Sequence, residues 1–374
     1  MAERPRLSPV VAGLPASTPF VGPEALERGR GARFRARVGA NESAFGVSAA
    51  ARRAVRAAVD QLSWYGDPEN HDLRQALAAH HGVVPERVVV GGGIDDLLAL
   101  CVRAFVGDGV AVMTGGSYAT FVYHVAGHGG QVHTVPYAGY RTDLEALAHA
   151  AAVERAAAVY LANPDNPAGT FHPAPAVEKL AAALPVGCAL LLDEAYAEFA
   201  PAAELIADKG LPANVVRLRT FSKAHGLAGA RVGYSISAGE VAAALDRIRQ
   251  QFGVNRVAQA AALASLGDSD FVAAVVAAVA GAREQVADIG RKAGLTPLPS
   301  STNFVAFDAG SARRADALLA ELQKRGVFVR KTHTPSADQW IRVTAGSDDD
   351  LAVLREELPA AVGSVDAGGA GPAG

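Results

Sequence analysis

The segment RTFSKAHGLAGAR, residues 219–231, follows a short apolar run, residues 215–218, that predicts a β-strand. It places one lysine, Lys223, between a hydroxyl residue and a glycine-rich loop. A lysine at such a strand end can hold a phosphate as a point charge, or its amine can form an imine with a carbonyl cofactor. An isolated lysine is more often a solvated surface residue, so the rest of the sequence has to decide between these interpretations.

The composition is that of a folded protein without a basic surplus. Hydrophobic residues make up 50% of the 374 residues, enough for a sizeable core in one large or two moderate domains. The net charge of -3 leaves no excess of cations for a nucleic-acid backbone, so nucleic acid is not an expected partner. Cys101 and Cys188 lie in apolar runs without a CxxC or Cys/His pattern. We expect core thiols in a reducing compartment and no metal site.

The two ends of the chain differ in composition from its middle. Residues 1–36 mix prolines with basic residues, which indicates an arm and makes a poor signal peptide. The longest apolar run, residues 271–282, is too short to span a bilayer, so we expect a cytoplasmic protein without a membrane partner. Residues 363–374 are rich in glycine and alanine, and we predict a disordered tail there.

Strand and helix patterns alternate through the middle of the chain. Alternating strands and helices predict an α/β fold, a mostly parallel sheet sandwiched by helices, in a large domain over residues 45–267. Residues 268–362 mix strands and helices in another rhythm and predict a smaller α+β domain, with residues 1–44 as an N-terminal arm. The predicted strands of the large domain are residues 87–90, 110–113, 131–135, 158–161, 189–192, 215–218 and 232–237.

Residues with chemical potential follow several of these strands directly. Ligands of such sheets bind at the carboxyl ends of the strands, so we expect these residues to gather at one edge of one sheet. The glycine loop 91–93 opens a helix, where backbone amides can bind an anion, although glycines there can equally serve a tight turn. The residues that follow a strand are Gly93, Tyr118, Asn166, Asp193 and Lys223.

This set contains the parts that an imine-forming pyridine cofactor needs. A carboxylate, Asp193, could keep a proton on the pyridine nitrogen, so that the ring remains an electron sink. Tyr196 and Asn166 could donate to the ring oxygen. Taken alone, Asp193 and Glu194 could simply cap a helix, and the matching neighbours of Lys223 reduce the weight of that alternative.

An anion site and a stacking residue complete the set. Ser222 and Arg231 flank the lysine, so a hydroxyl and a guanidinium could join the amides of the glycine loop around a phosphate. Tyr118 could stack on the face of the ring. Neither GxGxxG nor GxxxxGK[ST] is present, so nothing here indicates a dinucleotide or a nucleoside triphosphate.

From about residue 41 to residue 346, the chain resembles the fold-type I pyridoxal-phosphate enzymes. It is most similar to the class I/II aminotransferases, in the branch that contains histidinol-phosphate aminotransferase. The segment RTFSKAHGLAGARVGY resembles the lysine segment of the family and implies that Lys223 forms the Schiff base, with Ser222 and Arg231 on the cofactor phosphate. DEAY implies that Asp193 pairs with the pyridine nitrogen and Tyr196 with the ring oxygen, and NPDNPAG adds Asn166 on the same oxygen.

Two further segments complete the implied cofactor site. GGGIDD resembles the phosphate loop of the family, with backbone contacts from Gly93, Ile94 and Asp95. WYGDPENHDLR resembles the segment whose tyrosine, here Tyr65, reaches the cofactor phosphate of a neighbouring subunit. The resemblance therefore implies a homodimer with shared active sites.

Substrate residues are also implied by the resemblance. IRVTAG matches the segment whose arginine, here Arg342, binds the substrate α-carboxylate, for which a planar bidentate fork is suited. VFVRK implies that Arg330 meets a substrate phosphate. ANES resembles the substrate-side segment, at Asn41 and Glu42, although these two residues alone would also suit a turn and a helix cap.

The chain departs from the family pattern at several positions. The stacking tyrosine lies in GGSYATF, where the family usually has a proline-containing PTY. Ile94 replaces the hydroxyl residue usual in the phosphate loop. Asp165 and Ala168 stand where asparagine and threonine are common. These departures leave the cofactor chemistry intact and bear on the choice of substrate.

We predict a ping-pong aminotransferase of amino-acid biosynthesis with pyridoxal 5'-phosphate as cofactor. It would move an amino group between an amino acid or amino-alcohol phosphate of the histidinol-phosphate type and a 2-oxo acid such as 2-oxoglutarate. Lys223 would hold the cofactor as an imine and then act as general base at the substrate α-carbon. The alternative within the same fold is a decarboxylase of a phosphorylated amino acid. A regulator on this fold would usually carry an added DNA-binding domain, and the short N-terminal arm and the acidic net charge of the chain argue against one.

Overall fold

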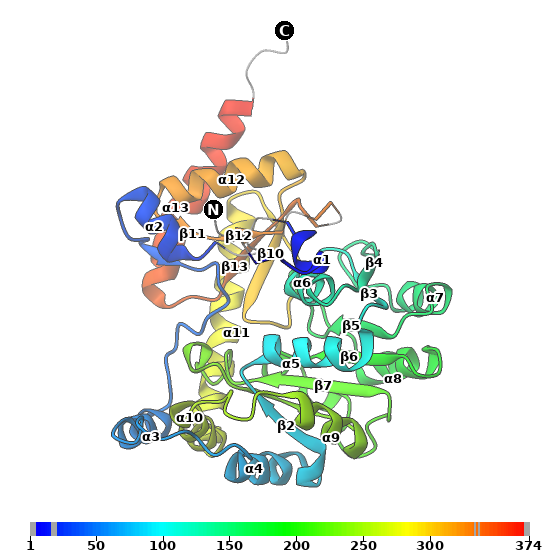
Figure 1. Ribbon diagram of the computed structural model, residues 1–374. Helices are drawn as coiled ribbons and strands as arrows, with labels where there is room; N and C mark the ends of the chain where they lie inside the picture. The colour runs from blue at the N-terminus through cyan, green and yellow to red at the C-terminus, as the bar shows by residue number, and fades with distance from the viewer. Residues whose placement is uncertain (1–4, 16–20, 333, 336, 370–374) are drawn as a thin grey trace.

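The computed structural model describes residues 5–15, 21–332, 334–335 and 337–369 (Figure 1). A seven-stranded sheet lies at its centre, with strands in the order β2-β8-β7-β6-β5-β3-β4. Only β8 runs antiparallel to its neighbours, so the predicted α/β fold with a mostly parallel sheet is confirmed. The strands are β2 (Val88–Gly91), β3 (Val110–Thr114), β4 (Gln131–Val135), β5 (Ala158–Ala162), β6 (Ala189–Asp193), β7 (Val215–Thr220) and β8 (Gly233–Ile236).

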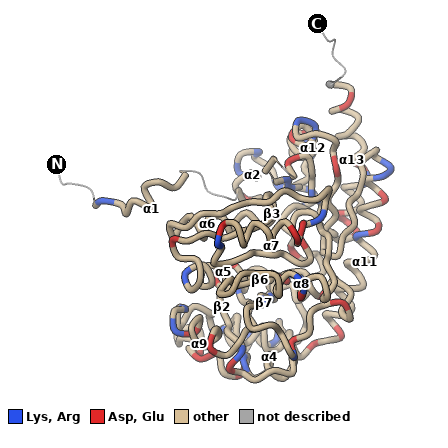
Figure 2. Tube along the Cα trace, turned by 90° about the vertical axis from the view of Figure 1, so that its right-hand side faces the viewer, with Lys and Arg blue, Asp and Glu red and all other residues tan. Residues whose placement is uncertain are grey.

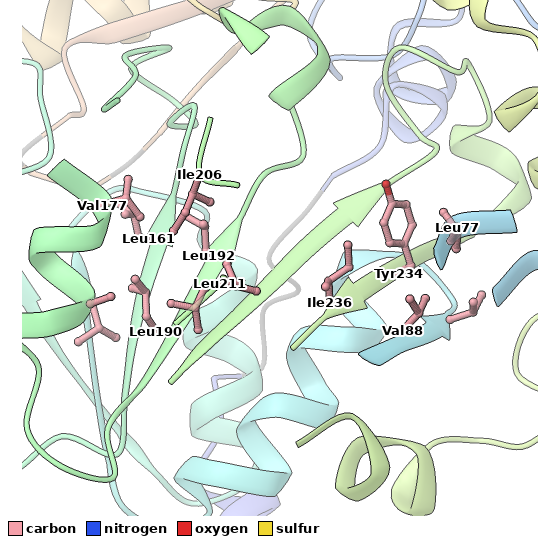
Figure 3. Packing of buried hydrophobic residues seen from close by; sticks show 14 of the residues in the cluster. Leu77, Val88, Leu161, Val177, Leu190, Leu192, Ile206, Leu211, Tyr234 and Ile236 are labelled. Atoms are coloured by element: carbon pink, nitrogen blue, oxygen red, sulfur yellow. The ribbon is translucent and has the colours of Figure 1, made fainter. Parts of the chain in front are cut away.

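Helices cover both faces of this sheet. Because side chains alternate along a strand, Leu190 and Leu192 of β6 enter one core cluster, and Leu191 enters the cluster on the other face. Figure 3 shows the first cluster, where Leu190 and Leu192 lie close to Val177 of a covering helix. The first face is covered by α4 (His71–His81), α7 (Leu144–Val153), α8 (Ala174–Ala183) and α10 (Arg256–Leu266), and the second by α5 (Ile94–Cys101), α6 (Thr120–Gly127) and α9 (Gly239–Ile248).

A second layered unit lies beside the carboxyl end of the large sheet (Figure 1). Its antiparallel sheet has the order β12-β13-β10-β9, and three long helices pack on it around Phe304 and Phe307. Asp268 caps the first of these helices directly after the break at Gly267 that the sequence predicts. The elements are β9 (Thr296–Pro297), β10 (Phe304–Asp308), β12 (Arg330–Lys331), β13 (Trp340–Thr344), α11 (Ser269–Lys292), α12 (Ala312–Lys324) and α13 (Asp348–Gly369).

The N-terminal segment is attached to this second unit. Strand β1 (Ala36–Arg37) pairs in parallel with β11 (Val327–Phe328), and Ala36 and Val38 are buried in the same core cluster as Phe304. The segment also contains two short helices that its weak periodicity does not predict, α1 (Pro9–Ala12) and α2 (Pro23–Arg30). In Figure 2, α1 projects from the body of the molecule next to α6. Helix α3 (Ala49–Val59) then leads into the large unit by packing on α10.

The predicted disordered tail is wrong for residues 363–369. Helix α13 continues to Gly369, because tertiary contacts hold a sequence that lacks helical periodicity of its own. Val365 packs against the core of the second unit, and the Asp366 carboxylate pairs with Arg314 at 2.8 Å. Arg325 also donates to the Ser364 hydroxyl. Residues 370–374 lie outside the described residues.

Other expectations from composition can be compared with the structure. Cys101 and Cys188 are free and buried, as predicted. Within the described residues no single helix is long and apolar enough to cross a membrane. Among the described helices, α10 and α11 meet the combined requirement of length and apolar composition only when taken together, and they are bent by 82° at the break between them. Lysines and arginines are interspersed with aspartates and glutamates over the traced chain (Figure 2).

A buried ion-pair network ties β6 to β7. Arg217, only 1% exposed, donates from Nε to Glu194 and from Nη1 to Asp208, both at 2.5 Å. Arg219 lies on the same face of β7 and donates to the same Glu194 oxygen at 2.8 Å. His81 contacts the other Asp208 oxygen at 2.8 Å. These contacts hold the carboxyl ends of β6 and β7 together. The residues that follow the two strands are candidates for the site.

Replacing Arg217 by leucine should lower the free energy of unfolding by about 3–5 kcal/mol, because buried carboxylates lose their counter-charge. Urea unfolding followed by circular dichroism measures this loss. Arg313 is exposed on α12, and Arg313→Leu provides the control, with an expected change within about 0.5 kcal/mol. A loss from Arg217→Leu as small as that of the control would contradict a stabilising role for the network.

Candidate active site

A cavity of about 900 Å³ lies at the carboxyl end of the large sheet, where the second unit meets it. Tyr118, Asn166, Asp193 and Lys223, each of which follows a strand, line this cavity as predicted. The arm and the second unit complete the wall. Further predicted residues on the wall are Asn41, Glu42, Ile94, Asp95, Tyr196, Ser222, Arg231, Arg330 and Arg342.

Lys223 lies in the loop that follows β7. A side chain at Gly226 of this loop would come within 1.9 Å of the Gly46 carbonyl oxygen, so the tight approach requires glycine. The Lys223 Nζ donates to the Asn41 carbonyl at 2.9 Å and lies 5.5 Å from the centre of the Tyr196 ring. Burial, reinforced by the Arg342 cation, lowers the pKa of the Lys223 amine to about 8. This amine is therefore a stronger nucleophile near neutral pH than an exposed lysine.

Asp193 ends β6 at the floor of the cavity. Its carboxylate accepts from the Tyr160 hydroxyl at 2.8 Å and from the Ala195 amide at 3.0 Å. Burial raises the pKa of the Asp193 carboxyl to about 6 in spite of these donors. Sequence reasoning missed Tyr160, although the sequence contains a signal for it. Tyr160 is a tyrosine within an apolar strand, β5, and the neighbouring strand β6 ends in an aspartate.

The ring-oxygen candidates lie next to the lysine. The Tyr196 hydroxyl accepts from the Asn41 Nδ2 at 2.9 Å, and burial raises the pKa of this phenol to about 12. Tyr196 therefore stays protonated and able to donate. The Asn166 side-chain oxygen accepts a hydrogen bond from Arg342 Nη1, which brings β13 of the second unit to the loop after β5.

The start of α5 forms the other end of the cavity. Gly93 has φ 98°, and a Cβ there would lie 2.7 Å from Arg231 Nη2, so the guanidinium packs directly on the glycine loop. Arg231 itself has a left-handed φ of 57°, a conformation that non-glycine residues adopt mainly where the surroundings impose it. The Ser222 hydroxyl accepts from Thr220 at 2.9 Å. This end combines a helix N-terminus, a hydroxyl and a cation, which suits a phosphate.

Tyr118 and Asp95 are joined at the same end. The Tyr118 hydroxyl donates to both Asp95 oxygens, at 2.9 and 3.1 Å. Burial opposes ionisation of Asp95, but hydrogen bonds from His124 and Tyr118 outweigh it and lower the pKa of this carboxyl. The ring-stacking candidate is therefore held in place even though its loop lacks the usual proline.

Two arginines face the opposite side of the cavity. Arg342 lies over the Phe304 ring at 5.2 Å, and burial lowers the pKa of its guanidinium. Arg330 donates from Nη2 to the Val21 carbonyl of the arm at 2.9 Å. The Glu42 carboxylate lies close enough to Lys223 and Arg330 to act on both electrostatically.

Asn41 connects these groups. It is 2% exposed with a left-handed φ of 54°. The Thr344 hydroxyl donates to its side-chain oxygen at 3.1 Å, and the Asn303 Nδ2 donates to its carbonyl at 3.1 Å. Sequence reasoning did not select Asn303 or Thr344, because nothing in their local pattern points to a segment about 260 positions or more away.

Two predicted residues do not line the cavity of this chain. Gly93 lies just behind it, under Arg231. Tyr65 is 78% exposed and packs on Phe252 with ring centroids 4.7 Å apart. A role for Tyr65 at a neighbouring subunit stays a prediction.

Comparison with known proteins gives the family. The model of the aminotransferase class I and II family matches residues 37–358. The chain belongs to this family. Histidinol-phosphate aminotransferase 2 of Ralstonia nicotianae is 37% identical over 367 residues, covering 96% of each chain.

Solved structures support the same conclusion. Histidinol-phosphate aminotransferase from Sinorhizobium meliloti, in complex with pyridoxal-5'-phosphate, is 46% identical with a TM-score of 0.93, covering 97% of this chain and 99% of that chain. A mutant of Thermus thermophilus aspartate aminotransferase, 24% identical with a TM-score of 0.78 and covering 96% and 100% of the two chains, shows the fold alone. The predicted pyridoxal-phosphate-dependent aminotransferase is confirmed, and these matches favour amino transfer over decarboxylation.

The described residues of this aminotransferase fit pyridoxal 5'-phosphate. A cation packed on a glycine loop at a helix start could hold the phosphate, and a buried carboxylate, Asp193, could pair with the ring nitrogen. Lys223 lies between these ends of one cavity. As an aminotransferase, the enzyme acts on small-molecule amino donors and keto-acid acceptors.

The pKa of Lys223 leads to a test on the aminotransferase without cofactor. Covalent attachment of added pyridoxal phosphate, trapped with borohydride and measured by mass spectrometry, should become faster as pH rises, with a midpoint near the pKa of about 8. Arg342→Leu removes a neighbouring cation and should move the midpoint upward. Lys223→Ala should show no attachment to this peptide. A midpoint near the pKa of about 10.4 of an exposed lysine would contradict the burial argument.

Proposed function

We propose that this aminotransferase takes its amino group from a small phosphorylated amine or amino acid of the histidinol-phosphate type. The acceptor would be a 2-oxo acid such as 2-oxoglutarate, and the two half-reactions would alternate at one site. The observation that carries the proposal is the pair Arg330 and Arg342 on the wall of the cavity, since two cations suit the two half-reactions, one for the phosphate of the amino donor and one for the carboxylate of the 2-oxo acid. The histidinol-phosphate aminotransferases among the relatives support it. We also propose a cytoplasmic enzyme of amino-acid biosynthesis.

The cofactor, when bound, supplies a carbonyl that exchanges amines and a ring that accepts electrons. In our proposal Lys223 is the nucleophile for that carbonyl and then moves a proton at the substrate α-carbon. Asp193 would keep the ring nitrogen protonated. Tyr196 and Asn166 would donate to the ring oxygen, and Tyr118 would pack on the ring. Backbone amides of Gly93, Ile94 and Asp95, together with Ser222 and Arg231, would hold the phosphate.

Substrate selection rests on the opposite wall. Arg342 would bind the carboxylate of the keto-acid partner, and Arg330 would bind the phosphate of the amino donor. Glu42 and Asn41 would line the space between the amino donor and Lys223. We further propose the division of the chain into an arm (1–44), a large domain (45–267) and a small domain (from 268).

Arg330→Ala tests the substrate directly. It should lower kcat/KM for phosphorylated donors about tenfold to a hundredfold, because hydrogen bonds to a charged group are lost, and change it little for unphosphorylated donors. A panel of donors with 2-oxoglutarate, assayed for glutamate and for carbon dioxide, provides the measurement. Arg313→Ala, remote and exposed, is the control. Equal losses for both kinds of donor would argue against a phosphate-binding role, and release of carbon dioxide would indicate decarboxylation.

We also propose a homodimer with shared active sites. Trp64 is 67% exposed and Tyr65 78% exposed, and a group of large apolar side chains on a protein surface often marks an interface. Val59, Leu62 and Phe252 of the same region are also exposed. If a second copy of the chain covers this group, Tyr65 of the first chain would reach the cavity of the second copy.

Subunit mixing tests the shared site. Tyr65→Ala and Lys223→Ala should each have low activity, and a mixture refolded together should regain activity, because in a mixed dimer one site keeps both residues intact. Lys223→Ala mixed with Asp193→Ala is the matched control and should regain none, since both residues belong to the same chain's site. Lack of restoration in the first mixture, or a monomer in solution, would contradict the proposal.

A further inference from the structure

Three departures from the family pattern meet in the structure. Ser117, from the segment without proline, donates its hydroxyl to Asp165 Oδ1 at 3.0 Å. The backbone amide of Ala168 donates to Asp165 Oδ2 at 2.9 Å. Ser117 is 3% exposed and Asp165 is 2% exposed, so water does not compete for these hydrogen bonds.

A third donor reaches the same carboxylate. The Tyr137 hydroxyl donates to Asp165 Oδ2 at 2.9 Å, and Tyr137 is 9% exposed. The three segments follow β3, β4 and β5, which are neighbours in the sheet. Burial raises the pKa of the Asp165 carboxyl to about 6, so near neutral pH it is an ionised group that only accepts. The Asp165 carboxylate thus connects the loops that follow three adjacent strands.

Each of these residues is connected to the cavity wall, of which Ser117 is itself a part. Ser117 precedes Tyr118, and Asp165 precedes Asn166, which accepts from Arg342. Tyr137 packs on Trp340 with ring centroids 5.1 Å apart, and Trp340 lies on the strand that carries Arg342. A shift of the carboxylate would therefore be transmitted to the loops on which the proposed cofactor contacts lie.

We propose that Asp165 is a positioning residue that fixes the loop of Tyr118 to the loop of Asn166. The inference rests on the proposed function of these two residues at the cofactor. The hydrogen bond from Ser117 takes over the restraint that a proline supplies elsewhere in the family. Loss of the carboxylate leaves buried donors without an acceptor, and they can be satisfied only if the loops move. The departures from the family pattern at these loops then act together as one hydrogen-bonded group, instead of each removing a contact by itself.

The test uses Asp165→Ala, Ser117→Ala, the double variant and Tyr137→Phe in the full-length enzyme. The dissociation constant of pyridoxal phosphate, the visible circular dichroism of the bound cofactor and the melting temperature of the cofactor-free protein are measured for each. Asp143→Ala is the matched control, because this carboxylate accepts from the Ala146 amide at the start of α7, outside the cavity lining.

Asp165→Ala should weaken cofactor binding about tenfold or more and alter the visible circular dichroism, since unsatisfied buried donors displace the loops. Ser117→Ala and Tyr137→Phe should have smaller effects in the same direction, and the double variant should match Asp165→Ala alone. Asp143→Ala should change only the melting temperature. The proposal is overturned if Asp165→Ala lowers the melting temperature while cofactor affinity and dichroism stay as in the wild type, or if the two single effects multiply independently. If the proposed substrate is wrong, the panel of donors will show it. The cofactor measurements would still decide the role of Asp165.

Discussion

The hydrogen bond from Lys223 Nζ to the Asn41 carbonyl joins the parts of the chain that build the cavity. Lys223 comes from the large sheet and Asn41 from the arm, and Thr344 of the second unit holds the Asn41 side chain. Asn303 donates to the same carbonyl as the lysine. The left-handed backbone of Asn41 is kept only because all these contacts determine it together. The cavity is therefore formed only where the arm, the large sheet and the second unit come together, and neither sheet forms it alone.

This arrangement places charges where water cannot solvate them. The lowered pKa of Lys223 means that the folded state binds fewer protons than the unfolded state between about pH 8 and the ordinary lysine value of about 10.4, so stability rises with pH there. The raised pKa of Asp193 has the opposite effect, and stability falls as pH rises from about 4 to 6. Near neutral pH both charged groups thus destabilise the cofactor-free fold. A cofactor with a carbonyl for the Lys223 amine and a ring nitrogen for the Asp193 carboxylate would relieve both costs, so cofactor binding should also stabilise the protein.

The sequence was informative where a local pattern carries the physics. Strands β5 and β6 are short apolar runs that end at or just before a polar residue, Asn163 and Asp193, and parallel strands deliver such residues to one edge. That reasoning placed Lys223 and Asp193 correctly in one cavity. It missed Tyr160, whose partner Asp193 ends the neighbouring strand, and it could not find Asn303, whose partner lies about 260 positions away. The glycine-rich end of α13 misled the composition argument because helical structure there depends on contacts with Arg314 and Arg325.

Departures from a motif have a different meaning once their positions in space are known. Read singly along the sequence, the segment before Tyr118 lacks the usual rigid proline, and Asp165 introduces a carboxylate into a buried turn. Each change alone would be unfavourable, since a buried carboxylate needs donors and a buried hydroxyl needs an acceptor. In the structure each supplies what the other lacks, over 3.0 Å. Ile94 differs, because the phosphate contacts expected of its position come from the backbone amide, which any side chain leaves in place. The effect of a departure from the motif thus depends on the residues that the new side chain contacts. A departure whose side chain has a buried hydrogen-bond partner indicates that the site is held by different contacts, not that it is lost.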